Sequence, residues 1–163
     1  LKFIRDFHNN DNYITAITNA IIEHFVKHGK PQRLIFSYHS LPVKIIQSGD
    51  AYFEQCILTS ALIAGKLKLD HSEYCVTFQS RFGGGNWISP TTAAIMAGLA
   101  KDGIKHIVVV CPGFISDCLE TLEEIDVTNR NIFIDNGGEE YHYIPCLNSS
   151  EQCIDLLYQL VKE

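Results

Sequence analysis

The sequence predicts an α/β fold, in which a parallel sheet carries helices on both faces. Strand-like and helix-like segments alternate along the chain, an order that produces parallel strands joined by right-handed crossovers. Residues 107–111 form a β-branched run that ends at a cysteine, a pattern typical of a strand covered on both faces. With 163 residues, of which 46% are hydrophobic, the chain suits one domain with a full core. We therefore expect a single α/β domain over residues 1–163.

The first half of the chain contains a short leading strand, one further strand and two helices. Apolar residues between Tyr13 and His28 recur at helical spacing, and Gly29 supplies a C-terminal stop. A loop at 39–50 is long for a strand-to-helix connection, and long loops of this kind are commonly functional. The predicted elements are a strand at 2–5, a helix at 13–28, a strand at 33–38 and a helix at 52–67.

The second half continues the alternation and closes with an amphipathic helix. Gly103 ends one helix, and Asn136-Gly137-Gly138 turns the chain into the last strand, which Pro145 ends. The predicted elements are strands at 74–79, 105–111 and 140–144, and helices at 91–101, from 116 or 117 to about 135, and at 149–162.

The loop SRFGGGNWISP at 80–90 combines three successive glycines with an arginine and the only tryptophan. A glycine-rich turn after a strand is found in dinucleotide sites, but GGG is not G-x-G-x-x-G and no helix follows it directly. We expect this loop to let backbone approach a ligand, and we do not expect NAD binding.

An acidic helix follows the central strand. Pro112-Gly113 stops the strand, and Ser116 or Asp117 can cap the helix. In an α-helix Leu119, Leu122 and Ile125 would form an apolar stripe, and Asp117, Glu120 and Glu124 would lie on another face.

These acidic residues allow two interpretations. Carboxylates near a helix N-terminus complement its dipole, which accounts for Asp117 and Glu120. Glu123 and Glu124 fit this less well, because like charges at i, i+3 and i+4 cost roughly 0.2–0.5 kcal/mol per pair. A bound cation would neutralise them, and ligands of open α/β sheets bind beyond the carboxyl ends of the strands.

Three loops leave this edge of the predicted sheet: His39 in one, Gln79-Ser80-Arg81 with Trp87 in the next, and residues 114–120 in the third. A histidine alone in a loop is more often an ordinary surface residue. Combined with carboxylates, it can bind a divalent metal or accept protons as a general base. We therefore expect His39, Trp87 and Glu120 to line one hollow.

Composition excludes several classes of partner. The net charge of −6 and pI near 5.6, without a basic run, argue against nucleic acid. Six cysteines contain no CxxC pair, which predicts reduced thiols of a cytoplasmic protein rather than a disulfide framework. No apolar run approaches the ~20 residues of a membrane helix. The start at Leu1, close to a strand, suggests a piece of a longer protein.

Several motifs together resemble ferrochelatases, the enzymes that insert ferrous iron into protoporphyrin IX to make protohaem. The motifs are SYHSLP at 37–42, GDAYFEQC at 49–56, TFQSRFG at 77–83 with Trp87, PGFISDCLETLEEID at 112–126 and GGEEYHYIPCLN at 137–148. The resemblance covers nearly the whole chain from Phe3 onward, with the motifs in the family's order.

The resemblance implies a chelatase-type fold of two Rossmann-like halves around a porphyrin cleft. This chain is similar to the C-terminal half. The expected partners are protoporphyrin IX, Fe²⁺ as substrate and the missing N-terminal half, which is also the expected source of any peripheral membrane contact. Because that half supplies much of the porphyrin pocket, we expect the chain alone to be inactive.

The resemblance also assigns roles to individual residues. His39 and Glu120 are the expected catalytic pair, which accepts pyrrole protons or binds the metal. The expected metal ligands are His39, Glu120, Glu124 and Asp117. The expected substrate contacts are Trp87 and Phe114, together with the loop residues Gln79, Ser80 and Arg81.

Two features separate this chain from many family members. Cys118 stands where they have histidine, which puts a histidine-based metal relay in doubt there. Many members bind a [2Fe–2S] cluster through cysteines that include a C-terminal group, whereas the cysteines here are scattered. We expect no iron–sulfur centre and no permanently bound cofactor in this piece.

Two alternatives remain open at this point. A chelatase for another metal or tetrapyrrole, such as cobalt with a corrin precursor, has similar motifs. A non-catalytic α/β binding domain would leave His39 and the acidic residues as solvated loop and cap residues. The second alternative requires His39 and Glu120 to lie on different faces.

Overall fold

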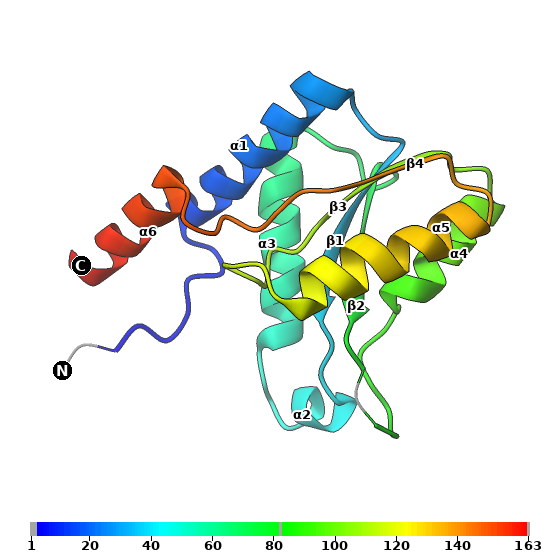
Figure 1. Ribbon diagram of the computed structural model, residues 1–163. Helices are drawn as coiled ribbons and strands as arrows, with labels where there is room; N and C mark the ends of the chain where they lie inside the picture. Colours follow the sequence, from blue (N-terminus) through cyan, green and yellow to red (C-terminus); the bar gives the residue numbers. More distant parts are fainter. Residues whose placement is uncertain (1–2, 82, 163) are drawn as a thin grey trace.

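A four-stranded parallel sheet forms the middle layer of the computed structural model, which describes residues 3–81 and 83–162. Its strands pair in the order β2-β1-β3-β4 (Figure 1). They are β1 (Arg33–His39), β2 (Tyr74–Gln79), β3 (His106–Val110) and β4 (Glu140–Tyr143). The parallel pairing confirms the predicted α/β fold class.

Helices cover both faces of this sheet, as the alternation predicts. Side chains from α1, α3 and α6 pack with one face, and side chains from α4, η1 and α5 pack with the other. The helices are α1 (Asp11–His28), α2 (Val43–Gln47), α3 (Tyr52–Leu67), α4 (Thr92–Lys101), the π-helix η1 (Glu120–Asn129), α5 (Arg130–Asp135) and α6 (Glu151–Lys162). Within residues 3–81 and 83–162, no helix has the length and apolarity needed to cross a bilayer.

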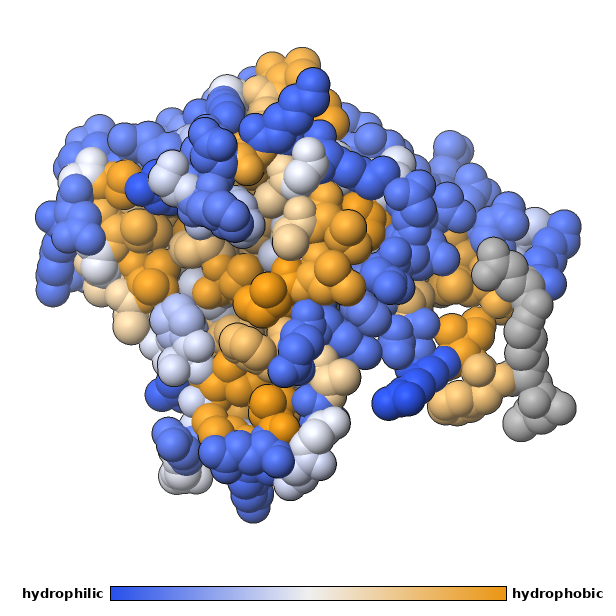
Figure 2. All heavy atoms as spheres, turned by 180° about the vertical axis from the view of Figure 1, so that it is seen from behind, coloured by the Kyte–Doolittle hydropathy of each residue, from blue (hydrophilic) through white to orange (hydrophobic). Residues whose placement is uncertain are grey.

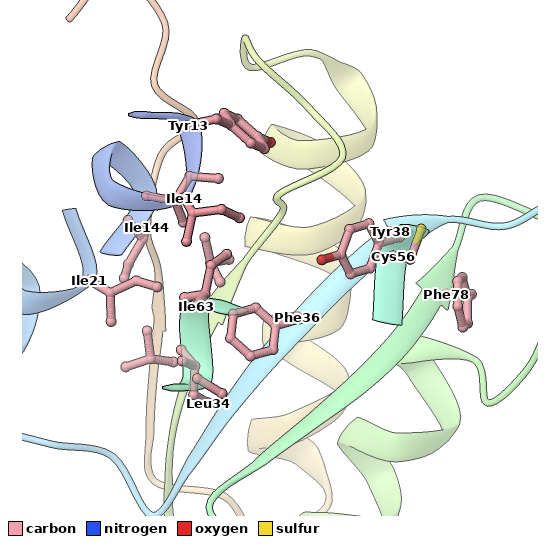
Figure 3. Close-up of a cluster of buried hydrophobic side chains, with 14 of the residues drawn as sticks. Tyr13, Ile14, Ile21, Leu34, Phe36, Tyr38, Cys56, Ile63, Phe78 and Ile144 are labelled. Carbon is pink, nitrogen blue, oxygen red and sulfur yellow. The ribbon is translucent and has the colours of Figure 1, made fainter. Parts of the chain in front are cut away.

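The two cores divide the strand residues by their alternation. In β1, Leu34 and Phe36 face α1 and α3, whereas Ile35 faces the opposite layer with Met96 of α4 and Phe133 of α5. Figure 3 shows the first core, where side chains of α1 and α3 converge on β1 and β2. Burial on both faces explains why the central strand β3 reads as a continuous apolar run from Ile107.

Three local predictions are corrected. Residues 3–5 form no strand, and residue 2 lies outside the described part; Phe3 is 85% exposed, so this segment buries no apolar face. The long loop at 39–50 contains the short helix α2, which periodicity did not show. The acidic helix begins at Glu120 rather than at residue 116 or 117, and its first ten residues form a π-helix.

The π-helix also changes which side chains are buried. Leu119 and Leu122 are 79% and 52% exposed, so the expected apolar stripe reaches the core only at Ile125. The buried residues of η1 are instead Thr121, Ile125 and Asn129, which lie four residues apart. Side chains use its carbonyl groups: Tyr141 donates to the Ile125 oxygen at 2.6 Å, and Asn129 to the Glu124 oxygen at 2.7 Å.

Candidate active site

An open hollow of about 500 Å³ gathers five of the predicted site residues at the carboxyl-end edge of the sheet. His39 is the last residue of β1, and Ser80 and Arg81 follow β2 directly. The π-helix η1 supplies the acidic wall. The lining residues are His39, Ser80, Arg81, Leu119, Glu120, Glu123 and Glu124. His39 and Glu120 therefore share one concavity, which argues against the non-catalytic alternative.

His39 is held with one ring nitrogen available. Its Nδ1 lies 2.7 Å from the carbonyl oxygen of Ser40, an atom that only accepts hydrogen bonds. Nδ1 therefore carries the hydrogen, and Nε2 of the neutral ring keeps its lone pair for a proton or a metal ion. The hydroxyl of Tyr52 donates to the His39 carbonyl oxygen at 2.8 Å and fixes the backbone at this point.

Glu120 is the carboxylate that shares electrostatic contacts with His39. A hydrogen bond from the Cys118 thiol, and then the backbone N–H of Glu120, lower the pKa of the Glu120 carboxyl, and the protonated form of His39 adds a smaller electrostatic effect in the same direction. Burial is the main cause that raises the pKa of the Cys118 thiol. Glu120 is consequently ionised at neutral pH, and Cys118 acts as a donor to it rather than as a thiolate.

Gln79 holds the backbone of Glu120 through a hydrogen bond from the end of β2. It is 2% exposed, and its Nε2 donates to the backbone oxygen of Glu120 at 2.6 Å. Its Oε1 accepts from the Ser37 hydroxyl at 2.7 Å, which anchors the amide within the sheet. Gln79 is absent from the lining of the hollow, so this geometry favours a positioning role over the predicted substrate contact.

Ser80 holds Glu124 with two neutral donors. The backbone N–H of Ser80 donates to one carboxylate oxygen at 2.8 Å, and its hydroxyl donates to the other. Ser80 adopts a left-handed backbone conformation with φ of 62°, which is uncommon for a residue with a Cβ. Gln79 and Ser80, at the end of β2, therefore hydrogen-bond the π-helix at both Glu120 and Glu124.

Asp117 lies outside the hollow, in contacts that join two loops. Its Oδ1 accepts from Tyr143 at 2.6 Å and from Thr121 at 3.0 Å, and its Oδ2 accepts from Asn148 at 2.7 Å. Burial raises the pKa of this carboxyl, but the hydrogen bonds outweigh burial and the net pKa is lowered. The arrangement favours an anchoring role over the predicted metal contact, because its lone pairs already have partners.

The two predicted aromatic contacts also lie elsewhere. Trp87 lines a separate hollow with Pro42 and Lys44, so the expectation that it shares one concavity with His39 and Glu120 is wrong. A β-bridge between Pro42 and Trp87 ties the glycine-rich loop to the segment before α2, which directs the indole there. Phe114 lines a small cavity beneath the loop after β3, with Val110 among its neighbours.

Sequence periodicity missed two lining residues, Leu119 and Glu123. An α-helical turn places Leu119 in the core, and the resemblance assigns no role to Glu123. The Glu123 carboxylate accepts from Thr128, five residues later, at 2.8 Å. A contact at this spacing follows from a π-helical turn, which no pattern of apolar residues signalled.

Comparisons with known proteins agree with these motifs. The family model described as Ferrochelatase matches residues 1–163. Curated ferrochelatases of Wigglesworthia glossinidia brevipalpis and Proteus mirabilis are 49% and 45% identical to the chain over 98% and 100% of its length. That of Pectobacterium atrosepticum is 47% identical over 99%. These alignments cover 50–51% of each relative, so the chain spans about half the length of the curated relatives it matches. A family model that extends over every residue, together with identity at this level, establishes that the chain belongs to the ferrochelatase family.

Proposed function

We propose that the protein containing this chain inserts Fe²⁺ into protoporphyrin IX, and that the carboxyl-end hollow handles the metal and the protons. The observation that carries this proposal is the shared hollow of His39, with Nε2 available, and Glu120, with a lowered pKa. A base and an ionised carboxylate beside each other suit a reaction that removes protons while it admits a cation.

The reaction exchanges two protons for one metal ion. Fe²⁺ sheds its water, two pyrrole N–H bonds break, and four nitrogens of the macrocycle bind the ion. His39 Nε2 accepts the first pyrrole proton, passes it to water and then accepts the second, while Glu120 attracts the cation. Glu123 and Glu124 raise the local cation concentration at the same wall. The neutral donors of Ser80 hold Glu124 in place without cancelling its charge.

The macrocycle needs apolar as well as charged contacts. Leu119, 79% exposed at the rim of the hollow, offers an apolar surface, and Arg81 offers a cation for a propionate. Trp87 is assigned to the wider porphyrin pocket, from the neighbouring hollow. Phe114 supports the loop that leads to the acidic wall. Asp117 is assigned to anchoring this loop.

The remaining half of the protein is expected to complete the pocket. Large hydrophobic side chains stay exposed on this chain, among them Val161 at 78% and Ile154 at 56% on α6. Figure 2 shows hydrophobic patches between hydrophilic areas on the side opposite to the view of Figure 1. We assign part of this surface to contact with the other half, and any peripheral membrane contact to that half.

We also propose that this chain contributes no ligands to an iron–sulfur cluster and works in the cytoplasm. Cys56, Cys111 and Cys153 are buried, and burial raises the pKa of the Cys56 thiol to about 12. Thiols of this kind are protonated and poorly suited to bind iron. Iron and acid-labile sulfide should be absent from residues 1–163 purified on their own.

The test is a metal-insertion assay of the full-length protein with Fe²⁺, Co²⁺ and Zn²⁺ and protoporphyrin IX. We expect insertion of Fe²⁺, with loss of the free-base porphyrin spectrum. No insertion of any of the three metals would contradict the proposal. Insertion of Co²⁺ alone, together with activity on a corrin precursor, would favour the cobalt alternative.

A second assay addresses the half-length chain. Its core is complete on both faces of the sheet, so we expect residues 1–163 to fold alone and to show negligible chelatase activity. Circular dichroism and the same insertion assay measure both outcomes. Turnover close to that of the full-length protein would show that the other half is dispensable.

A further inference from the structure

Four histidines and one glutamate cluster at the end of the sheet opposite to the hollow. His24 and His28 lie in the last turns of α1, and His106 is the first residue of β3. Glu140 and His142 belong to β4. None of the five lines the carboxyl-end hollow, so this group is a second concentration of possible metal ligands.

Strand register and helix spacing bring these side chains together. His106 pairs with Glu140, and His142 lies two residues further along the same strand, so the three share one face of the sheet. His24 and His28 are four residues apart and point to the same side of α1. Ring centroids of His24 and His28 are each 4.9 Å from that of His142, and the His106 centroid is 5.6 Å from it.

Donor atoms of three residues are already close. One ligand atom each from His106, Glu140 and His142 lies within 4.8 Å of the others. Glu140 accepts a hydrogen bond from His142 Nε2 at 2.7 Å, and its other oxygen is 3.8 Å from His106 Nδ1. Glu140 is half-exposed, so its carboxylate can rotate without disturbing the core.

Two imidazole nitrogens in this group make no hydrogen bond within the described residues. Over residues 3–81 and 83–162, Nε2 of His24 and Nε2 of His106 are buried without a hydrogen-bond partner. An unpaired buried polar atom costs about 1–3 kcal/mol, so packing alone would favour an apolar residue at either position.

We propose that His106, Glu140 and His142, with His24 as the fourth donor, form a binding site for a divalent transition-metal ion of the Zn²⁺ type. Imidazole nitrogen with one carboxylate suits Zn²⁺, Co²⁺ and Ni²⁺, whereas Mg²⁺ and Ca²⁺ prefer oxygen ligands. Ligand bonds of about 2.0–2.2 Å require the three donor atoms to move closer than they are now. The bound ion replaces the proton between His142 and Glu140 and joins α1 to β3 and β4.

The test separates this site from the carboxyl-end hollow. The full-length His39→Ala variant leaves carboxylates as the metal ligands of the hollow, so a Co²⁺ spectrum with nitrogen ligands, together with Zn²⁺ calorimetry, reports binding at the histidines. We expect one equivalent of Zn²⁺ in this variant, a Co²⁺ spectrum with nitrogen ligands, and a rise in Tm with Zn²⁺. Adding His142→Ala should weaken Zn²⁺ binding by at least about tenfold, since even outer partners of metal ligands commonly contribute 10- to 100-fold.

Glu140→Gln is the second variant, because it changes a half-exposed side chain and leaves the core intact. It should also weaken Zn²⁺ by about tenfold or more. His71→Ala, which removes an exposed histidine outside the group, is the matched control and should bind as the parent does. Unchanged Zn²⁺ affinity in both His142→Ala and Glu140→Gln, or no binding in His39→Ala, would show that the histidines only pack together.

Discussion

The two ends of the sheet hold different sets of donor groups. At the carboxyl end, one histidine shares an open hollow with three glutamates. At the amino end, four histidines surround one glutamate, and two of their nitrogens are buried. Carboxylates in open water attract a cation and release it easily, whereas imidazoles retain transition metals. This comparison fits the two proposals, in which a metal ion passes through the carboxyl-end hollow and another stays bound at the histidines.

The backbone supports of the two ends also differ. The glutamates of the hollow belong to a π-helix, which Gln79 and Ser80 at the end of β2 hold in place by hydrogen bonds. The histidines belong to the paired strands β3 and β4 and to α1, so the register of the strand pair sets the relative positions of His106 and His142. Each of the following changes affects one end and should leave the other unchanged.

The largest effect is expected from the catalytic pair. His39→Ala removes the proposed proton acceptor, and Glu120→Gln removes the negative charge that is proposed to attract the metal ion. Each should lower kcat of the full-length protein by roughly 10²-fold or more, the scale of a positioned acid–base group. Steady-state insertion assays with Fe²⁺ measure this loss.

Glu123→Gln provides the comparison within the same hollow. It removes an equal charge from a side chain that already accepts from Thr128, so we expect a much smaller loss of kcat. Equal losses in all three variants would mean that general electrostatics, rather than positioned chemistry, explains the hollow. Wild-type kcat in His39→Ala would remove that histidine from the mechanism.

Asp117→Asn should destabilise the loops at the carboxyl end by about 2 kcal/mol, because an amide N–H₂ replaces an acceptor that faces several donors. The folded pKa of Asp117 is lowered. Its contribution to stability is therefore complete above the unfolded value of about 3.9 and is lost as pH falls through the lower folded value. The difference between wild type and variant in urea unfolding should be full at pH 7 and shrink below about pH 4.

A difference that stays constant from pH 7 to pH 3 would contradict this account of Asp117. Zn²⁺ affinity at the histidine cluster serves as the internal control and should not change, since Asp117 contacts none of its members.

Gln79→Met should have a moderate effect, since it removes the hydrogen bond to the Glu120 backbone but keeps the volume of the side chain. We expect a loss of about 1 kcal/mol in stability and a fall in kcat of up to about tenfold. Gln152→Met, which changes an exposed glutamine of α6, is the control. A loss of stability without any change in kcat would limit Gln79 to a structural role.

The smallest effect is expected from His142→Ala on catalysis. Because His142 lies at the opposite end of the sheet, kcat for Fe²⁺ insertion should match that of the wild type, measured with excess metal. A fall in kcat as large as that of His39→Ala would show that the two ends are coupled, and the comparison would then fail.

Local patterns were sufficient to predict most of the fold. Alternation of strand and helix patterns predicted the parallel sheet, and β-branched runs predicted burial on both faces. Because loops after parallel strands meet at one edge, His39, Ser80 and Glu120 could be placed together from their positions in the sequence.

The rest of the site depended on contacts between distant segments. Whether a helix makes i→i+4 or i→i+5 bonds near Glu120 depends on carbonyl groups that Gln79, Tyr141 and Asn129 use, and apolar periodicity does not record this. The position of Trp87 depended on a bridge to Pro42. The histidine cluster depends on the register of β3 with β4, so no sequence spacing revealed it.

The hydrogen bonds from Ser80 to Glu124 bear on the rate of the proposed Fe²⁺ capture. Two neutral donors leave the charge of this carboxylate uncompensated. Three glutamates and one arginine line the hollow, so its net charge is negative. An excess of negative charge at an open surface speeds the arrival of a divalent cation, and salt weakens this attraction over about 10 Å at 0.1 M. The association rate for Fe²⁺ should therefore depend steeply on ionic strength, while the rate of the subsequent proton transfers should not.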